Sequence, residues 1–198
     1  MKFPRVFSGR RVSNFIKSVQ NGTITMPQSV TSTTVTIAAV DMNNTLLFQT
    51  GRRYSDNAGV PYFADAGHSE LYLVLTNSVT VTLKTGGGTF VGANAWIYDY
   101  SVIEFWPGVW SSIQRGESAI TGNVNSVTVT LDHPVNPKRA ILMSLGMTSA
   151  QVSTEEIRRT IIDVTLTDQK TLTVARTMNN DGNAPTYVST ISWQLADP

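Results

Sequence analysis

The sequence contains no cysteine, which excludes disulfide bonds, thiolate catalysis and cysteine-based zinc sites. Charged residues are also scarce: they make up 15% of the chain, against roughly 25% in an average soluble domain. No stretch approaches the roughly 18 apolar residues that a membrane-spanning helix needs, so we expect no membrane partner. The first residues, MKFPRVFSGRRV, have no continuous apolar core and therefore predict no signal peptide.

Catalytic signatures are missing as well. The only histidines are His68 and His133, and neither a G-x-S-x-G nor an H-E-x-x-H motif occurs. Glycoside cleavage needs two carboxylates facing the same bond. Asp99 and Glu104 are an odd number of positions apart on a predicted strand, which puts them on opposite faces of a sheet. We therefore expect no enzyme, no cofactor and no metal site.

Threonine, serine, asparagine and valine take the place of the missing charges, and 41% of the residues are hydrophobic. Several stretches alternate apolar and polar residues, which is typical of a half-buried strand. The predicted strands of the first half of the chain are residues 33–40, 45–50, 71–76, 79–84 and 95–105. Turn signals at TNS (residues 76–78) and TGGGT (residues 85–89) predict hairpins.

The chain contains an internal repeat. Five blocks match in the same order, at shifts of 94, 94, 95, 91 and 90 residues: 19–22 with 113–116, 34–37 with 128–131, 46–51 with 141–146, 75–83 with 166–174, and 102–105 with 192–195. Such an order with small insertions indicates a tandem duplication. Pro107 and Gly108 mark the boundary, because both residues interrupt strands.

These patterns predict an all-β protein with two tandem, homologous antiparallel β-sandwich domains of about six strands each. We expect a basic N-terminal arm at residues 1–13, a first β-sandwich at 14–108 and a second at 109–198. A possible capping box predicts one short helix within residues 148–160. Trp106 and Trp110 are candidates for the seam between the two domains; the alternative is that each belongs to the core of its own domain.

Both repeats keep a Gln-x-Gly stretch near their start, QNG at residues 20–22 and QRG at residues 114–116. Asn-Gly alone would predict a tight hairpin turn, but arginine is a poor residue for the same position. The shared glycine instead predicts a bulge, with glycine in the left-handed region, inside a kinked first strand.

The first 20 residues carry five basic residues and no acid, whereas the remainder carries 10 basic and 14 acidic residues. This asymmetry predicts an arm that docks on an acidic partner surface; the alternative is a solvated, frayed terminus. Nucleic acid is not an expected partner, because the arm lacks a dense basic cluster with stacking aromatics. The candidate partner-binding residues of the arm are Lys2, Arg5, Arg10 and Arg11.

The two repeats differ most at residues 52–70, which form a long polar and aromatic stretch expected to be a loop. Loops that diverge between duplicated scaffolds are where function usually differs. The candidates for contact with a partner or a glycan are Arg52, Arg53, Tyr54, Tyr62, Phe63 and His68. Trp96, Tyr98 and Tyr100 share one strand face, which favours sandwich core over a sugar-stacking platform.

The stretches IKSVQNGTIT, TTVTIAAVD, LLFQTG and LTNSVTVT resemble small virion proteins of tailed bacteriophages, which often open with an Ile-Lys-Ser-Ile-Gln-Arg-Gly-like stretch. The second repeat is less similar, with Ser111 in place of Lys17. The resemblance implies a structural virion protein made in the host cytoplasm, commonly in a tail, baseplate or fibre. It implies other virion proteins, and further copies of the chain, as partners. A capsid decoration protein and a host-glycan adhesin are the alternatives.

Overall fold

The computed structural model describes residues 15–27, 30–54, 71–85, 95–121, 124–149, 162–176 and 188–198. These residues form antiparallel β-sheets, which confirms the predicted all-β fold. The first six strands are β1 (Ile16–Met26), β2 (Ser32–Thr36), β3 (Thr45–Tyr54), β4 (Leu71–Asn77), β5 (Thr80–Thr85) and β6 (Trp96–Phe105). The next six are β7 (Ser112–Ile120), β8 (Ser126–Thr130), β9 (Ile141–Ser149), β10 (Ile162–Leu166), β11 (Thr171–Arg176) and β12 (Ser189–Asp197). A 3-10 turn, η2 (Met42–Asn44), precedes β3.

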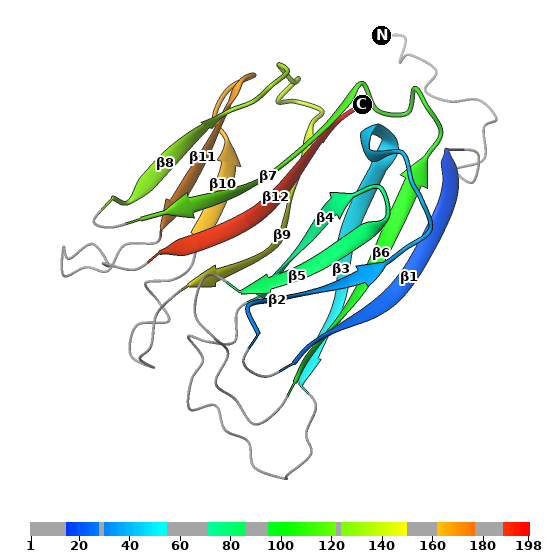
Figure 1. Ribbon diagram of the computed structural model, residues 1–198. Coiled ribbons are helices and arrows are strands. Elements are labelled where there is room, and N and C mark those ends of the chain that lie inside the picture. The colour runs from blue at the N-terminus through cyan, green and yellow to red at the C-terminus, as the bar shows by residue number, and fades with distance from the viewer. Residues whose placement is uncertain are drawn as a thin grey trace, which may run out of the picture.

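The same strand order occurs twice. In the first half, β1-β6-β3 faces β2-β5-β4, and in the second half β7-β12-β9 faces β8-β11-β10 (Figure 1). We call β1–β6 module one and β7–β12 module two. The ladder is irregular at matching places: β3 carries an extra residue between Gln49 and Gly51, and β9 carries one between Ser144 and Met147. Each module is therefore a small sandwich of two three-stranded sheets.

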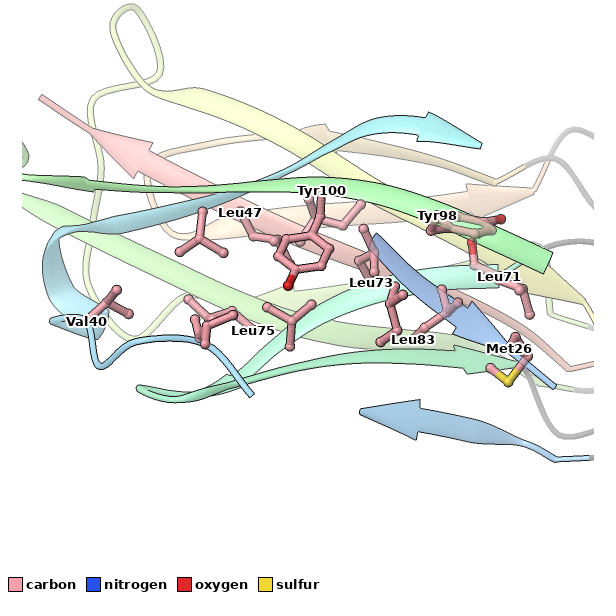
Figure 2. Close-up of a cluster of buried hydrophobic side chains, with 14 residues drawn as sticks. Met26, Val40, Leu47, Leu71, Leu73, Leu75, Leu83, Tyr98 and Tyr100 are labelled. Carbon is pink, nitrogen blue, oxygen red and sulfur yellow. Dashed lines mark hydrogen bonds between the residues drawn. The ribbon is translucent and has the colours of Figure 1, made fainter. Parts of the chain in front are cut away.

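The core of module one lies between its two sheets. Figure 2 shows Tyr98 and Tyr100 of β6 facing Leu73 and Leu83 of the opposite sheet. Trp96 packs against the same cluster, so this aromatic face is core, as its spacing predicted. Aromatic side chains suit this place because each buries a large apolar area. The equivalent core of module two gathers side chains from both of its sheets in the same way.

Gly22 and Gly116 each lie opposite a large aromatic residue of the central strand. Gly22 pairs with Tyr100 and Gly116 pairs with Trp193. A Cβ added to Gly22 would lie 2.3 Å from the Tyr100 Oη, and one on Gly116 would lie 2.5 Å from the Trp193 Cζ2. The predicted bulge is wrong: the ladder continues through both glycines, and neither has a positive φ. The glycines are there to make room for an aromatic ring.

The glutamine of each Gln-x-Gly stretch holds the chain that crosses between the sheets. Gln20 Oε1 accepts from the Ala38 N–H at 2.7 Å, and its Nε2 donates to the Ala38 carbonyl at 3.0 Å. Gln114 makes the same pair of bonds to the backbone of His133, at 3.1 and 2.9 Å. The two stretches are therefore one structural device used twice.

The glycine pairing corrects one block of the sequence repeat. It places Tyr100 on Trp193, a shift of 93 residues, where the sequence blocks gave 90. At the same shift Glu104 corresponds to Asp197. The backbone N–H of Asp41 donates to Glu104 at 3.0 Å, and that of Asn136 donates to Asp197 at 3.3 Å. Each carboxylate therefore holds the segment that crosses between the sheets of its own module.

Other local predictions need correction. Strand β3 continues to Tyr54, so Arg52, Arg53 and Tyr54 belong to a strand and not to the predicted loop. The β4–β5 hairpin is confirmed, but β5 and β6 lie in different sheets, so these two strands do not form the second predicted hairpin. Of the predicted helix, Thr148 and Ser149 belong to β9 and residues 150–160 lie outside the described residues.

Candidate functional site

The two modules meet where the outer face of the β7-β12-β9 sheet lies against the β3 and β4 edges of module one. Tyr72 of β4 pairs with Gly146 of β9, which links two sheets into one of six strands, β2-β5-β4-β9-β12-β7. Gly146 has a φ of +110°, and a Cβ there would lie 2.5 Å from the carbonyl oxygen of Leu71. This junction requires glycine both for its backbone conformation and for the closeness of β4.

Two side chains of module two bind the edge of β3 that has no neighbouring strand among those described. Gln194 Oε1 accepts from the Leu47 N–H at 3.2 Å, and its Nε2 donates to the Leu47 carbonyl. The Nη2 of Arg115 donates to the carbonyl of Thr45. An edge strand presents unpaired backbone groups, and these side chains pair them. Burial lowers the pKa of Arg115 to about 10, because its guanidinium loses hydration. It remains protonated at neutral pH.

A third polar contact and one apolar side chain complete the module interface. Lys84 Nζ lies 2.6 Å from Glu117 Oε1, and the Tyr72 hydroxyl donates to Glu117 Oε2 at 3.3 Å. Burial, together with the charge of Glu117, raises the pKa of Tyr72, so its phenol stays a donor. Leu145, at the irregularity of β9, packs into the core of module one. Module two thus contributes directly to the neighbouring core.

A cleft of about 870 Å³ runs between the modules. Its lining includes Met42, Lys84, Trp110, Arg115, Glu117 and His133. The volume falls within the range of ligand pockets, but Lys84, Arg115 and Glu117 inside it are engaged in the interface just described. Across the described stretches, no group of three or more histidine and acidic side chains is placed to hold a metal ion. The cleft has the composition of a module seam.

The aromatic residues proposed for the seam have different surroundings. Trp106 is 50% exposed and belongs to neither described core cluster, so it is not a seam residue. Trp110 lines the cleft, and its ring stands edge-on to Phe105 with ring centroids 5.4 Å apart. Of the two, only Trp110 lies at the junction of the modules.

Of the site residues predicted from sequence, the structure describes the side chains of Arg52 and Arg53. Arg53 forms an ion pair with Asp99, whereas Arg52 lies over the ring of Trp96, 5.5 Å from its centroid. A hydrogen bond from Thr23, opposed by slight desolvation and supported by Arg53, lowers the pKa of Asp99. The remaining predicted residues, Lys2, Arg5, Arg10, Arg11, Tyr62, Phe63 and His68, lie outside the described residues, as does the side chain of Tyr54.

Sequence reasoning missed the residues that join the modules. A signal existed in the repeat itself once the register is known, because equivalent positions differ in kind. Gln194 stands where module one has Ser101, and Arg115 stands where it has Asn21. Long amide and guanidinium side chains in module two, at positions where module one has short polar side chains, indicate a contact that only module two makes.

Comparison with known proteins returned no similar family, curated protein or solved structure. In the described part of the chain, no helix has the length and apolar character needed to cross a membrane.

Proposed function

We propose that the protein is a non-enzymatic structural component of a tailed-phage particle, associated with its tail, baseplate or fibres. The supporting observation is what the residues of the phage-like stretch do in the fold. Gln20 anchors the crossing chain, and Gly22 makes room for Tyr100. The resemblance thus rests on residues that build the sandwich, which suits a protein whose role is to be a building block.

The use of buried polar side chains supports the same proposal. Gln194 and Gln114 bind backbone groups, and Glu104 accepts from Lys17 Nζ, Ser18 Oγ and the Asp41 N–H at 2.8, 3.1 and 3.0 Å. Active sites instead leave polar groups free to meet a substrate. In the described residues these groups are committed to the scaffold.

The proposal is tested on particles purified from an infection in which the gene carries an epitope tag. We expect the full chain in the particles by mass spectrometry, with immunogold label on the tail. A variant lacking residues 1–13 should be folded but absent from particles, because the basic arm carries the contact with neighbours. Absence of the full-length chain from purified particles would contradict the virion role.

The same labelling separates the alternatives. Gold on the head identifies a capsid decoration protein instead of a tail component. A glycan array with the full chain and with a variant lacking residues 55–70 tests the adhesin. Binding that disappears with those residues would favour a host-glycan role.

A further inference from the structure

Module one packs against the outer face of the β7-β12-β9 sheet in module two. Module one has an equivalent outer face of its own, and the described residues of the chain leave it uncovered. On β12 every residue from Ile191 to Asp197 is buried, because one face lines its own core and the other lies under module one. On the equivalent strand β6, buried and half-buried residues alternate from Tyr98 to Glu104. We call the uncovered outer surface of β1 and β6 the open face; its outward side chains are Val19, Asn21, Thr23, Asp99, Ser101 and Ile103.

Module two has an edge equivalent to the β3 edge that Arg115 and Gln194 bind in module one, and the described residues leave this equivalent edge uncovered. In module one, residues 44–47 are all buried beside Arg115 and Gln194. Their counterparts in module two, residues 139–142, are exposed or half-buried. Leu46 is 3% exposed, whereas its counterpart Ile141 is 47% exposed. We call residues 139–142, together with Ala175, the counterpart of Lys84, the open edge.

We propose that the open edge of one copy docks on the open face of a second copy, in the way that the two modules pack within one chain. The interface between the modules joins two different surfaces, and each chain retains one unused example of each. Copies would therefore join head to tail and form a ring or a filament. The biological setting of this contact rests on the proposed structural function, but the contact itself is argued from the burial pattern.

The apolar residues of the two open surfaces match. Val19 is 50% exposed and is paired on the open face with the half-buried Ile103. Ile141 on the open edge is the counterpart of a side chain that is buried within the chain. Removing these aliphatic groups from water favours association.

The polar residues make the contact between copies weaker than the one within the chain. Asn21 and Ser101 replace Arg115 and Gln194, and they are shorter and bonded to each other at 2.6 Å. Fewer edge groups are therefore capped by long side chains, and the association should be reversible.

At the position of the ion pair within the chain, charge does not oppose this docking. The counterparts of Lys84 and Glu117 are Ala175 and Thr23, so an uncharged pair takes the place of an ion pair. The charge of Asp99 on the open face is already balanced by Arg53. No like charges are therefore brought together at these positions.

The first test is analytical ultracentrifugation of the full chain and two exposed-site variants. Val19→Arg disables the open face, and Ile141→Arg disables the open edge. We expect the unmodified chain to form larger species as concentration rises. Each variant alone should be monomeric, and an equal mixture should form a dimer that grows no further, because one intact edge meets one intact face. Circular dichroism confirms that both variants fold.

Two results would overturn the proposal. One is an unmodified chain that stays monomeric up to about 1 mM, where contacts worth about 4 kcal/mol are half formed. The other is a mixture of variants that stays monomeric, or an Ile141→Arg variant that dimerises alone, as a symmetric face-to-face contact would allow. A chain that is found in particles but never self-associates contradicts only this docking, whereas one that self-associates but is missing from particles contradicts only the virion role.

A crosslinking experiment determines how the two copies are oriented. Because the native chain has no cysteine, only the introduced residues can react. Thr23→Cys and Ala175→Cys chains are mixed and treated with a short bis-maleimide. The Glu117→Cys/Lys84→Cys double variant, whose positions touch within one chain, is the positive control. We expect crosslinks between position 23 of one copy and position 175 of another. Crosslinks that join only position 23 to position 23 would overturn the head-to-tail arrangement.

Discussion

The amide of Gln194 in module two binds both backbone polar groups of Leu47 in module one. The side chain is fully buried, and the two residues are 147 positions apart in the sequence. These hydrogen bonds take the place of a neighbouring strand along the outer edge of β3. This side chain therefore couples the stability of the two modules, together with the other contacts of the interface.

Replacing Gln194 with alanine should destabilise the protein strongly. The Leu47 N–H and carbonyl would stay buried without partners, at a cost of about 2–4 kcal/mol. Gln20→Ala is the matched control, because it removes the same kind of paired bond at an exposed place where water can substitute. We expect about 0.5–1.5 kcal/mol for the control. Urea unfolding measures both, and equal losses would contradict the special role of the buried bond.

Substituting Gly22 should disturb the ring of Tyr100. Gly22→Ala places a Cβ where the ring lies, and we expect a loss of about 1–3 kcal/mol. If crowding is the cause, a second change, Tyr100→Leu, should cost less in the Gly22→Ala background than in the native one. A double-mutant cycle by urea unfolding measures this coupling. Strict additivity would show that the glycine serves another purpose.

The junction glycine Gly146 should tolerate alanine poorly. Its positive φ and the nearby backbone of Leu71 together predict a loss of about 2–4 kcal/mol. The matched control is Gly51→Ala at the equivalent place in module one, where the nearest atom is the movable carboxylate oxygen of Asp99 at 2.8 Å. That change should cost about 1 kcal/mol or less. Thermal unfolding of both variants distinguishes a requirement of the junction from one of the strand.

Glu104 should make the protein sensitive to acid. Burial acts to raise the pKa of Glu104, but hydrogen bonds from Lys17, the Asp41 N–H and Ser18 outweigh it and hold the pKa below its ordinary value of 4.5. A lowered pKa gives stability that is fully present above pH 4.5 and is lost as the pH falls below it.

The variant Glu104→Gln should therefore lose less unfolding free energy than the native protein between about pH 5 and pH 3. Some dependence should remain, because the pKa values of Asp41 and Asp99 are also lowered. Chemical unfolding at a series of pH values measures the two slopes. Parallel slopes would exclude Glu104 as a source of the acid sensitivity.

Local patterns predicted much of the fold, and the reason is visible at particular residues. The alternation in β6 predicted the buried Tyr98 and Tyr100, and the odd spacing placed Asp99 and Glu104 on opposite faces, where the structure has them. Each of these inferences depends only on the period of a strand, which a short stretch of sequence contains.

The predictions that failed concern contacts between residues that are distant in the chain. The role of Gly22 cannot be read without knowing that Tyr100, 78 positions away, lies opposite it. The same holds for Gln194 and Leu47. The candidate site was missed for this reason: the sequence drew attention to charged and aromatic residues, whereas the modules are joined by an amide, a guanidinium and a glycine whose partners are mostly backbone atoms.

The glutamine anchors also bear on how such a module can change during evolution. Gln20 reaches a residue 18 positions ahead, and Gln114 reaches one 19 positions ahead, yet both form the same pair of bonds. A flexible side chain has absorbed a one-residue insertion that a strand ladder would have turned into a shift of register. Crossing segments held in this way can lengthen or shorten while the sheets stay as they are, so the loops are free to diverge on a fixed frame.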